Sequence, residues 1–353
     1  MLGHDRCLKS LRGEKVDRIS VHPEIDLVYA APQFNVSVGE CFIYPETHAK
    51  ALVNSLELHP DVDGLYVNLC VSPKIAVEDR TELDGLTKEE IRYIKDSAGM
   101  TWRIPNNDVG AVTEHDIVDL DDERLITEDP FIVGILETYK LIPEETKKKY
   151  LIIPGITSPY CQLDFILGMT PLLLAMYDEP EKLKKALQHR TNLAIKWANE
   201  YAKLGVECVW IGDGSASSSI ISPEMYEEFV LPYVTQLVDV LKSHGITSIM
   251  HVCGDINPSI DVISRSGVDG LDIDFPVDLE VARKKVPKHI CFKGNLNPVN
   301  LLQKSADEIY KECQEIILNA GEPFVLSTGC LLARDTPPKN VDAMVKAAME
   351  YKK

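Results

Sequence analysis

The residues best suited to chemistry in this sequence are His251 and Cys253, separated by one residue, and the distant Cys330. Residues 248–253 have the apolar character of a short buried strand, and side chains two positions apart on a strand point to the same face. An imidazole and thiolates are ligands that zinc binds, and three protein ligands leave a fourth position open for a substrate. The sequence therefore predicts a catalytic zinc site at His251, Cys253 and Cys330. The alternative is that the cysteines only pack in the core, because nothing local connects Cys330 to the His-x-Cys pair.

Other polar side chains follow other predicted strands and are expected near the same site. Four of them are candidates for lining a substrate or cofactor pocket: His22, Glu24, Asp213 and Asn295. Structural alternatives exist, since a histidine at a strand end is often hydrogen-bonded within the fold and an aspartate between glycines can cap a loop. The cysteines outside the triad are interpreted as packing or incidental thiols.

The elements that must position these residues alternate between strand and helix, most regularly after about residue 130. About eight short apolar strands are expected, beginning near Val16, Gly64, Tyr150, Cys208, Ser248, Gly270, Ile290 and Phe324. The alternation specifies parallel pairing, and eight strands close a TIM-type (β/α)8 barrel, whose active sites lie at the C-terminal strand ends. We therefore predict an α/β fold with a single barrel domain over residues 1–353. A doubly wound open sheet is the alternative, but no glycine-rich nucleotide motif supports it.

The N-terminal part of the chain departs from this regular pattern. Residues 30–44 are irregular, with a proline, a glycine and several aromatic residues, and are expected to form a loop or lid. Residues 81–125 are polar and rich in turn signals, which indicates an excursion of short strands or a hairpin. Further on, Ser222 followed by a proline is typical of a helix start, and this helix is expected to reach Ser243.

The composition is that of an ordinary globular protein, and its charge excludes several classes of partner. Of 353 residues, 45% are hydrophobic, and 55 acidic against 37 basic residues give a net charge of −18. Such a surface repels nucleic acid and anionic membranes. No secretory segment or membrane-spanning apolar run is evident. The nine cysteines are scattered, so we expect reduced thiols and a cytoplasmic location.

Four stretches of the chain resemble the uroporphyrinogen decarboxylase fold superfamily, and they extend from near one end to near the other. They are RGEKVDRI at 12–19, ISPEMY at 221–226 with LPY at 231–233, FKGN at 292–295 and TPPKNV at 336–341. The resemblance implies a distorted (β/α)8 barrel. It also implies one of two activities, since the superfamily contains decarboxylases and zinc-dependent corrinoid methyltransferases such as the methylcobalamin:coenzyme M enzymes.

The resemblance favours the methyltransferase branch, because His251, Cys253 and Cys330 stand where those enzymes carry their zinc ligands. The decarboxylases lack this triad, carry a histidine in place of Cys330, and have an arginine-rich motif where residues 22–26 contain no arginine. The implied activity is transfer of a methyl group to a small thiol such as coenzyme M. The implied donor is methylcobalamin or a methylated corrinoid on a separate corrinoid-binding protein.

One departure from the methyltransferase pattern concerns the fourth zinc ligand. The resemblance implies an acidic residue at a position that here corresponds to Phe275. Asp272 and Asp274 share one face of the preceding strand, so we expect Asp274, Asp272 or water to complete the site. Alternatively, Asp274 only orients His251.

The acceptor and the direction of transfer are left open by the sequence. A sulfonate such as that of coenzyme M needs a cation, and Lys293 and Arg334 are the cations near the predicted site, although both also suit a structural role. The alternatives are an enzyme that loads the corrinoid from a methyl donor, a uroporphyrinogen decarboxylase, and a non-catalytic corrinoid- or zinc-binding protein. The oligomeric state is not indicated.

Overall fold

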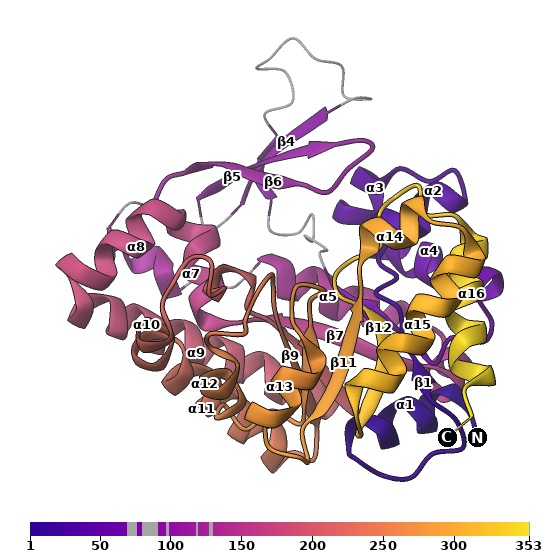
Figure 1. Ribbon diagram of the computed structural model, residues 1–353. Helices are drawn as coiled ribbons and strands as arrows, with labels where there is room; N and C mark the ends of the chain where they lie inside the picture. The colour runs from indigo at the N-terminus through magenta and orange to yellow at the C-terminus, as the bar shows by residue number, and fades with distance from the viewer. Residues whose placement is uncertain (69–75, 80–90, 97–98, 118, 127–129, 353) are drawn as a thin grey trace.

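The computed structural model describes residues 1–68, 76–79, 91–96, 99–117, 119–126 and 130–352, and an eight-stranded parallel sheet forms its centre (Figure 1). In spatial order the strands are β1 (Ser20–Val21), β12 (Phe324–Thr328), β11 (Cys291–Leu296), β10 (Gly270–Ile273), β9 (Thr247–Val252), β8 (Cys208–Gly212), β7 (Leu151–Thr157) and β2 (Gly64–Val67). The two ends of this order approach each other where the Asp63 N–H donates to the Val21 carbonyl at 2.8 Å. The sheet is therefore a nearly closed barrel, and the predicted fold class is confirmed.

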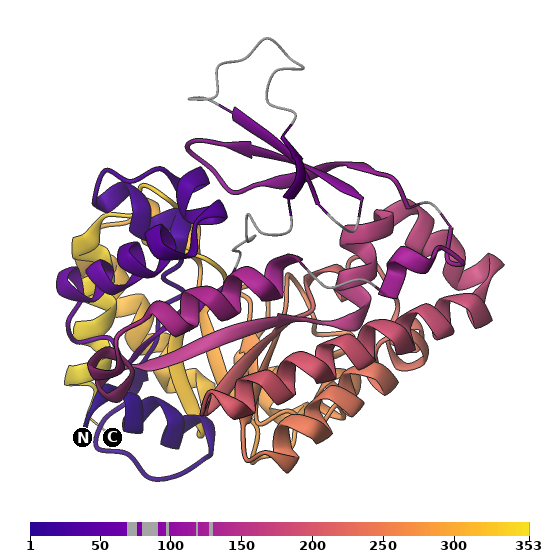
Figure 2. The same ribbon diagram turned by 180° about the vertical axis from the view of Figure 1, so that it is seen from behind.

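Helices cover the outside of the barrel (Figures 1 and 2). They are α1 (Gly3–Leu11), α2 (Leu27–Gln33), α3 (Val38–Ile43), α4 (Pro45–Leu58), α5 (Pro130–Leu141), α6 (Glu144–Lys149), α7 (Pro159–Leu167), α8 (Met169–Asp178), α9 (Pro180–Lys203), α10 (Pro223–Phe229), α11 (Leu231–Ser243), α12 (Ile260–Ser264), α13 (Leu279–Lys285), α14 (Pro298–Gln303), α15 (Ala306–Ala320) and α16 (Pro338–Glu350). The strands are covered by helices on one face and packed inside the barrel on the other, so every residue of β9 and β12 is buried.

A second, antiparallel sheet lies over one end of the barrel (Figures 1 and 2). Its strands are β3 (Ala76–Asp79), β4 (Ile91–Asp96), β5 (Met100–Pro105) and β6 (Ala111–His115), and they enter the chain between β2 and α5. Trp102 fixes the sheet to the barrel, since its ring lies 6.0 Å from that of Phe42 and 6.5 Å from that of Phe165. The predicted excursion of short strands in residues 81–125 is thus confirmed where it is described; residues 80–90 lie outside the described residues.

The prediction of a loop or lid over residues 30–44 is wrong, because this region contains α2 and α3. The Asp26 carboxylate caps α2 by accepting from the Val28 N–H at 3.0 Å, and the Ser37 hydroxyl caps α3 by accepting from the Glu40 N–H at 3.1 Å. Pro32 lies inside α2, where a proline usually ends a helix, and this masked the helical pattern.

Two helical segments of the chain are each divided in two. The segment from Ser222 begins as predicted, with Ser222 as N-cap, but it breaks at Val230 into α10 and α11. Pro232 explains the break, because it cannot supply the N–H that would continue the helix. Helices α7 and α8 meet at Gly168, which has a φ of +83°, and they are bent by 113°. In the described part of the chain no single helix is long and apolar enough to cross a membrane, and α7 with α8 passes that test only as this bent pair.

Candidate metal centre at the barrel mouth

His251, Cys253 and Cys330 meet at the C-terminal end of the barrel strands. His251 lies near the end of β9, Cys253 follows that strand directly, and Cys330 lies two residues after β12. β9 and β12 are separated in the sheet by β10 and β11, so the group is assembled across the barrel mouth. Their ligand atoms lie within 4.8 Å of one another, and His251 Nε2 is 3.2 Å from Cys253 Sγ. The barrel thus brings together three residues that the sequence separates by up to 79 positions, from 251 to 330.

These separations and donor types fit a zinc ion. Zinc–nitrogen and zinc–sulfur bonds in a tetrahedral site place neighbouring ligand atoms about 3.6 Å apart. His251 Nε2 and Cys253 Sγ are 3.2 Å apart, and all three ligand atoms lie within 4.8 Å of one another. His251 is buried, whereas Cys253 and Cys330 are half-buried. The two sulfurs therefore face the more open side, from which a fourth ligand would approach.

The orientation of His251 is set by two neighbours. Its Nδ1 lies 3.1 Å from the Asp272 carbonyl oxygen, which can only accept, so Nδ1 carries the proton and Nε2 is free to bind a metal. The indole of Trp210 stacks on the imidazole with ring centroids 5.9 Å apart and an interplanar angle of 21°. Together these contacts hold Nε2 toward the two sulfurs.

A buried network of charges lies next to the triad and centres on Asp272. Its Oδ2 accepts from the Tyr66 hydroxyl at 2.8 Å and from the Trp210 Nε1–H at 3.2 Å. Lys293 Nζ donates to both carboxylate oxygens at 3.0 and 3.1 Å, to Glu24 at 3.3 Å and to the Ser327 hydroxyl at 2.6 Å. Burial and the charge of Asp272 raise the pKa of Glu24 well above its usual value. Lys293 is therefore the buried cation that both Asp272 and Glu24 contact, and the raised pKa of Glu24 favours the protonated form of that carboxyl group.

This network bears on the two cations expected near the acceptor. Lys293 is completely buried and its donors are directed at Asp272, Glu24 and Ser327, so it is not placed to hold a substrate sulfonate. Arg334 is 43% exposed, and its Nη1 donates to the Asn107 carbonyl in the turn between β5 and β6 at 3.3 Å. Of the two, only Arg334 lies where a ligand has access.

The carboxylates expected to complete the metal site are arranged differently from the prediction. Both oxygens of Asp274 accept from backbone N–H groups, Oδ2 from Gly254 and Oδ1 from Phe275, each at 2.7 Å. Asp274 thus holds the turn that carries Cys253. Among the described residues, Glu24 and Asp272 form a separate group of possible metal ligands with His251, and this group does not include Cys253 or Cys330.

Asp213, Asn295 and His22 occupy strand ends, as predicted, but each packs within the fold. Asp213 accepts from the Tyr226 hydroxyl at 3.0 Å, and burial raises its pKa to about 6. The Asn295 side-chain amide donates to the Val277 carbonyl at 2.9 Å. His22 lies edge-on to a tyrosine ring at 4.8 Å, and burial, followed by the charge of a lysine, lowers its pKa to about 3. None of the three belongs to the group of metal-ligating atoms found among the described residues.

Two residues of the site were missed by the sequence reasoning, Trp210 and Tyr66. Both lie on barrel strands with apolar neighbours, so the sequence predicts only buried strand positions there. For Trp210 the sequence contains a partial signal. It stands two residues before Gly212, the last residue of β8, so its side chain lies on the same face of the strand as that end. Their partner Asp272 could not be identified from spacing.

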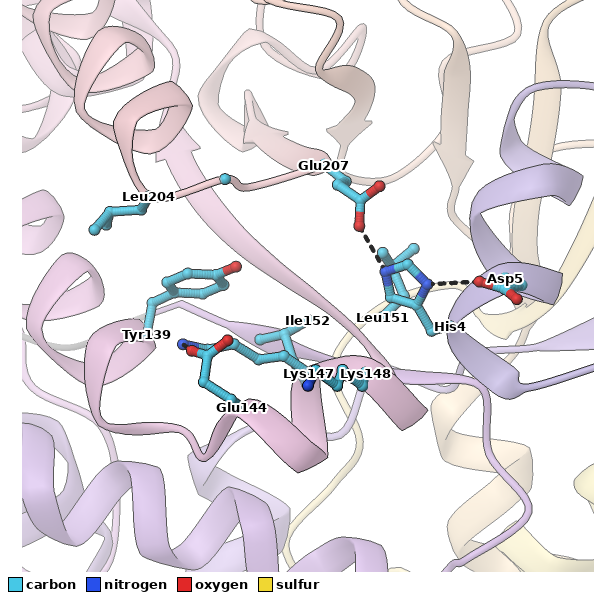
Figure 3. A pocket seen from close by; sticks show the side chains of 11 residues that line it. His4, Asp5, Tyr139, Glu144, Lys147, Lys148, Leu151, Ile152, Leu204 and Glu207 are labelled. Carbon is cyan, nitrogen blue, oxygen red and sulfur yellow. Dashed lines mark hydrogen bonds and ion pairs between the residues drawn. The ribbon is translucent and has the colours of Figure 1, made fainter.

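A pocket lies at the opposite, N-terminal end of the barrel strands (Figure 3). It has a volume of about 350 Å3 and lies beside the first residue of β7, Leu151, and beside Glu207, which precedes β8. His4 crosses it, with Nε2 2.8 Å from Glu207 and Nδ1 3.0 Å from Asp5. In barrels of this type the N-terminal face contributes to stability and catalysis takes place at the other end, so the triad is the better candidate for the functional site.

Comparison with known proteins agrees with this architecture. The family model for uroporphyrinogen decarboxylase matches residues 2–351. The chain is 26% identical to the methylcobamide:CoM methyltransferase MtbA of Methanosarcina mazei, over 99% of this chain and 98% of that protein. It is 29% identical to MtbA of Methanosarcina acetivorans, in an alignment that covers 62% of this chain and 63% of that protein.

A solved structure described as a methyltransferase from Methanosarcina mazei has the same fold. It superposes with a TM-score of 0.81 at 23% sequence identity and covers 99% of both chains. The fold is thus shared over nearly the full length of both chains. Because the family model extends over nearly every residue, the chain belongs to the uroporphyrinogen decarboxylase family.

Proposed function

We propose that this protein is a zinc-dependent methyltransferase that moves a methyl group from a methylated corrinoid to a thiol. The observation that carries the proposal is the convergence of His251, Cys253 and Cys330 within 4.8 Å at the barrel mouth. The names of two relatives, which are methylcobamide:CoM methyltransferases, support the same reaction. Coenzyme M is therefore one candidate acceptor.

The residues of the triad supply a site for the acceptor sulfur. Zinc, when bound, lowers the pKa of a thiol so that the acceptor is present as its thiolate. Cys253 and Cys330 as thiolates balance the two charges of the ion, so the acceptor sulfur keeps its negative charge and remains nucleophilic. His251, held by the Asp272 carbonyl and the Trp210 ring, fixes the third ligand position.

The group transfer balances without any further reactant. The acceptor thiol first releases its proton to solvent. The sulfur then attacks the methyl carbon, a carbon–sulfur bond forms, and the cobalt–carbon bond breaks with its electron pair remaining on cobalt. The products are a methyl thioether and a Co(I) corrinoid. The corrinoid must approach the mouth from outside, so a separate corrinoid-binding protein is the proposed partner.

The test is a methyl-transfer assay with zinc-loaded protein, methylcobalamin and a panel of small thiols. We expect thiol-dependent loss of methylcobalamin absorbance and formation of the thioether by mass spectrometry. Removal of zinc with a chelator should abolish the reaction, and added zinc should restore it.

Two outcomes would overturn the proposal. The first is decarboxylation of uroporphyrinogen at a rate unchanged by chelation, which would identify a decarboxylase. The second is the absence of transfer with any thiol, either from methylcobalamin or in the reverse direction from a methyl thioether to Co(I) corrinoid, which would favour a non-catalytic binding protein.

A further inference from the structure

A small recess lies beside the metal triad, at the C-terminal ends of β2, β7 and β8 (Figure 2 shows these strands from behind). Its volume is about 30 Å3, enough for roughly two water molecules or a group of that size. Ile135 and Phe165 contribute apolar side chains to the lining, and Gly155 contributes none. The recess is therefore mainly apolar and suits only a few non-hydrogen atoms.

The recess and the triad share one side chain. Trp210 lines the recess, and the same indole stacks on His251. A thiol bound with its sulfur beside Cys253 and Cys330 would extend its tail toward the recess along this indole. The recess lies at β2, β7 and β8, and β8 is the direct neighbour of β9, which carries His251.

Asn68 gives the recess a polar group that lacks a partner. It lines the recess and is 5% exposed, and its Oδ1 has no hydrogen-bond partner among the described residues. A buried carbonyl oxygen without a donor costs free energy, and such groups are rare in folded proteins. A ligand with a hydroxyl or amide N–H at the end of its tail would supply the missing donor.

The charges around the recess do not suit an anionic tail. No charged side chain appears in its lining within the described residues. Lys293 is already occupied by Asp272 and Glu24, and Arg334, although accessible, does not line the recess. A sulfonate or carboxylate in the recess would lose its hydration without gaining a cation, which is strongly unfavourable.

We propose that the recess binds the tail of the acceptor thiol and selects a short, uncharged tail that ends in a hydrogen-bond donor. This inference rests on the proposed function, since it takes the acceptor to be a thiol bound at the triad. The sulfur lies at the metal, the carbon chain lies against Trp210, Ile135 and Phe165, and the terminal hydroxyl or amide donates to Asn68 Oδ1.

The first measurement separates binding from catalysis. Cobalt(II) replaces zinc, and thiol binding is followed by the sulfur-to-cobalt absorption band without any corrinoid. We expect 2-mercaptoethanol to bind about 10-fold more tightly than its near-isostere 1-propanethiol, which corresponds to one hydrogen bond to Asn68. Coenzyme M, which has the same two-carbon chain and a sulfonate, should bind more weakly than either.

Two variants test the role of the recess. Asn68→Leu should remove the preference for 2-mercaptoethanol over 1-propanethiol. Gly155→Ala should shrink the recess without a clash, because a Cβ there would lie 3.4 Å from Trp210 and 3.6 Å from the Asn68 Cβ. The Gly155→Ala variant should lose more affinity for 2-mercaptoethanol and 1-propanethiol than for methanethiol. Leu318→Ala, at an exposed position on α15, is the control and should preserve the ranking.

The outcomes distinguish this inference from the proposed function. If the cobalt protein prefers coenzyme M, or if Gly155→Ala weakens methanethiol as much as the longer thiols, the recess is not the tail site and the inference is wrong. The predicted ranking in cobalt binding without methyl transfer would support the recess and overturn the methyltransferase reaction. Absence of thiol binding to the metal-loaded protein would overturn both.

Discussion

The Nδ1–H of His251 donates to the main-chain carbonyl of Asp272 at 3.1 Å, across two strands that pair in register at these two residues. The acceptor is part of the backbone of β10, so the tautomer of the histidine is fixed by the barrel and does not depend on a side chain. This leaves the Asp272 carboxylate free for Tyr66, Trp210 and Lys293. One residue thus orients the imidazole and anchors the charge network beside it.

Metal binding should depend on each sulfur of the triad. We expect Cys253→Ala and Cys330→Ala each to weaken zinc binding by more than about 100-fold, since even loss of a residue that supports a ligand costs 10- to 100-fold. Cys313→Ala is the matched control, because Cys313 is a buried thiol on α15. Competition with a chelating dye measures the affinity. Retention of zinc by both triad variants would show that the metal, if present, binds elsewhere.

Lys293 and Glu24 should be coupled energetically. Lys293→Met leaves the buried carboxylates of Asp272 and Glu24 without their cation, and breaking a buried pair of this kind costs about 3–5 kcal/mol. Glu24→Gln removes the acidic group that Lys293 contacts beside Asp272, so the double variant should lose less stability than the sum of the two single losses. Urea unfolding of the four proteins gives the coupling free energy. Additive effects of the two substitutions would mean that Lys293 and Glu24 are not coupled.

The barrel could be predicted from the sequence because its signal is local and repeated. Each strand is an apolar run between turn residues, and every strand except β2, which the small antiparallel sheet follows, leads to a helix, so the sequence predicts all eight strands of the barrel. The short helices α2 and α3 could not be recognised in the same way. Their formation depends on caps at Asp26 and Ser37 and on packing that tolerates Pro32, and none of these produces a periodic pattern.

The candidate site was predictable only where strand geometry determines it. His251 and Cys253 share a strand face, and the barrel brings Cys330 to the same end, so these three could be named in advance. The supporting residues could not be named in advance, because the sequence does not show whether charged residues such as Lys293 and Asp274 are exposed or buried. Only the packing determines this. Lys293 turned out to be fully buried, and Asp274 is bound to two backbone amides.

His48 should make the protein sensitive to acid. It is fully buried on α4, and burial lowers its pKa to about 3. The unfolded chain binds a proton near pH 6.5 that the folded protein does not, so the free energy of unfolding should fall by up to about 1.4 kcal/mol per pH unit as the pH drops from 6.5 toward 3. His48→Leu should remove this contribution.

This prediction is checked by the slope of the free energy of unfolding against pH, so an absolute value of the stability is not needed. Urea unfolding of the wild type and the His48→Leu variant between pH 7 and pH 5 gives the two slopes, whose difference should correspond to about one proton. Equal slopes would show that His48 is protonated in the folded state.

X-ray absorption at the zinc edge, recorded before and after addition of an acceptor thiol, tests the central claim most directly. The resting protein should show two sulfur scatterers at about 2.3 Å together with nitrogen or oxygen ligands, as expected for Cys253, Cys330 and His251. Addition of the thiol should raise the number of sulfur scatterers to three, because the acceptor sulfur takes the open position. A shell of nitrogen and oxygen alone, or two sulfurs that stay unchanged at saturating thiol, would contradict the proposed function.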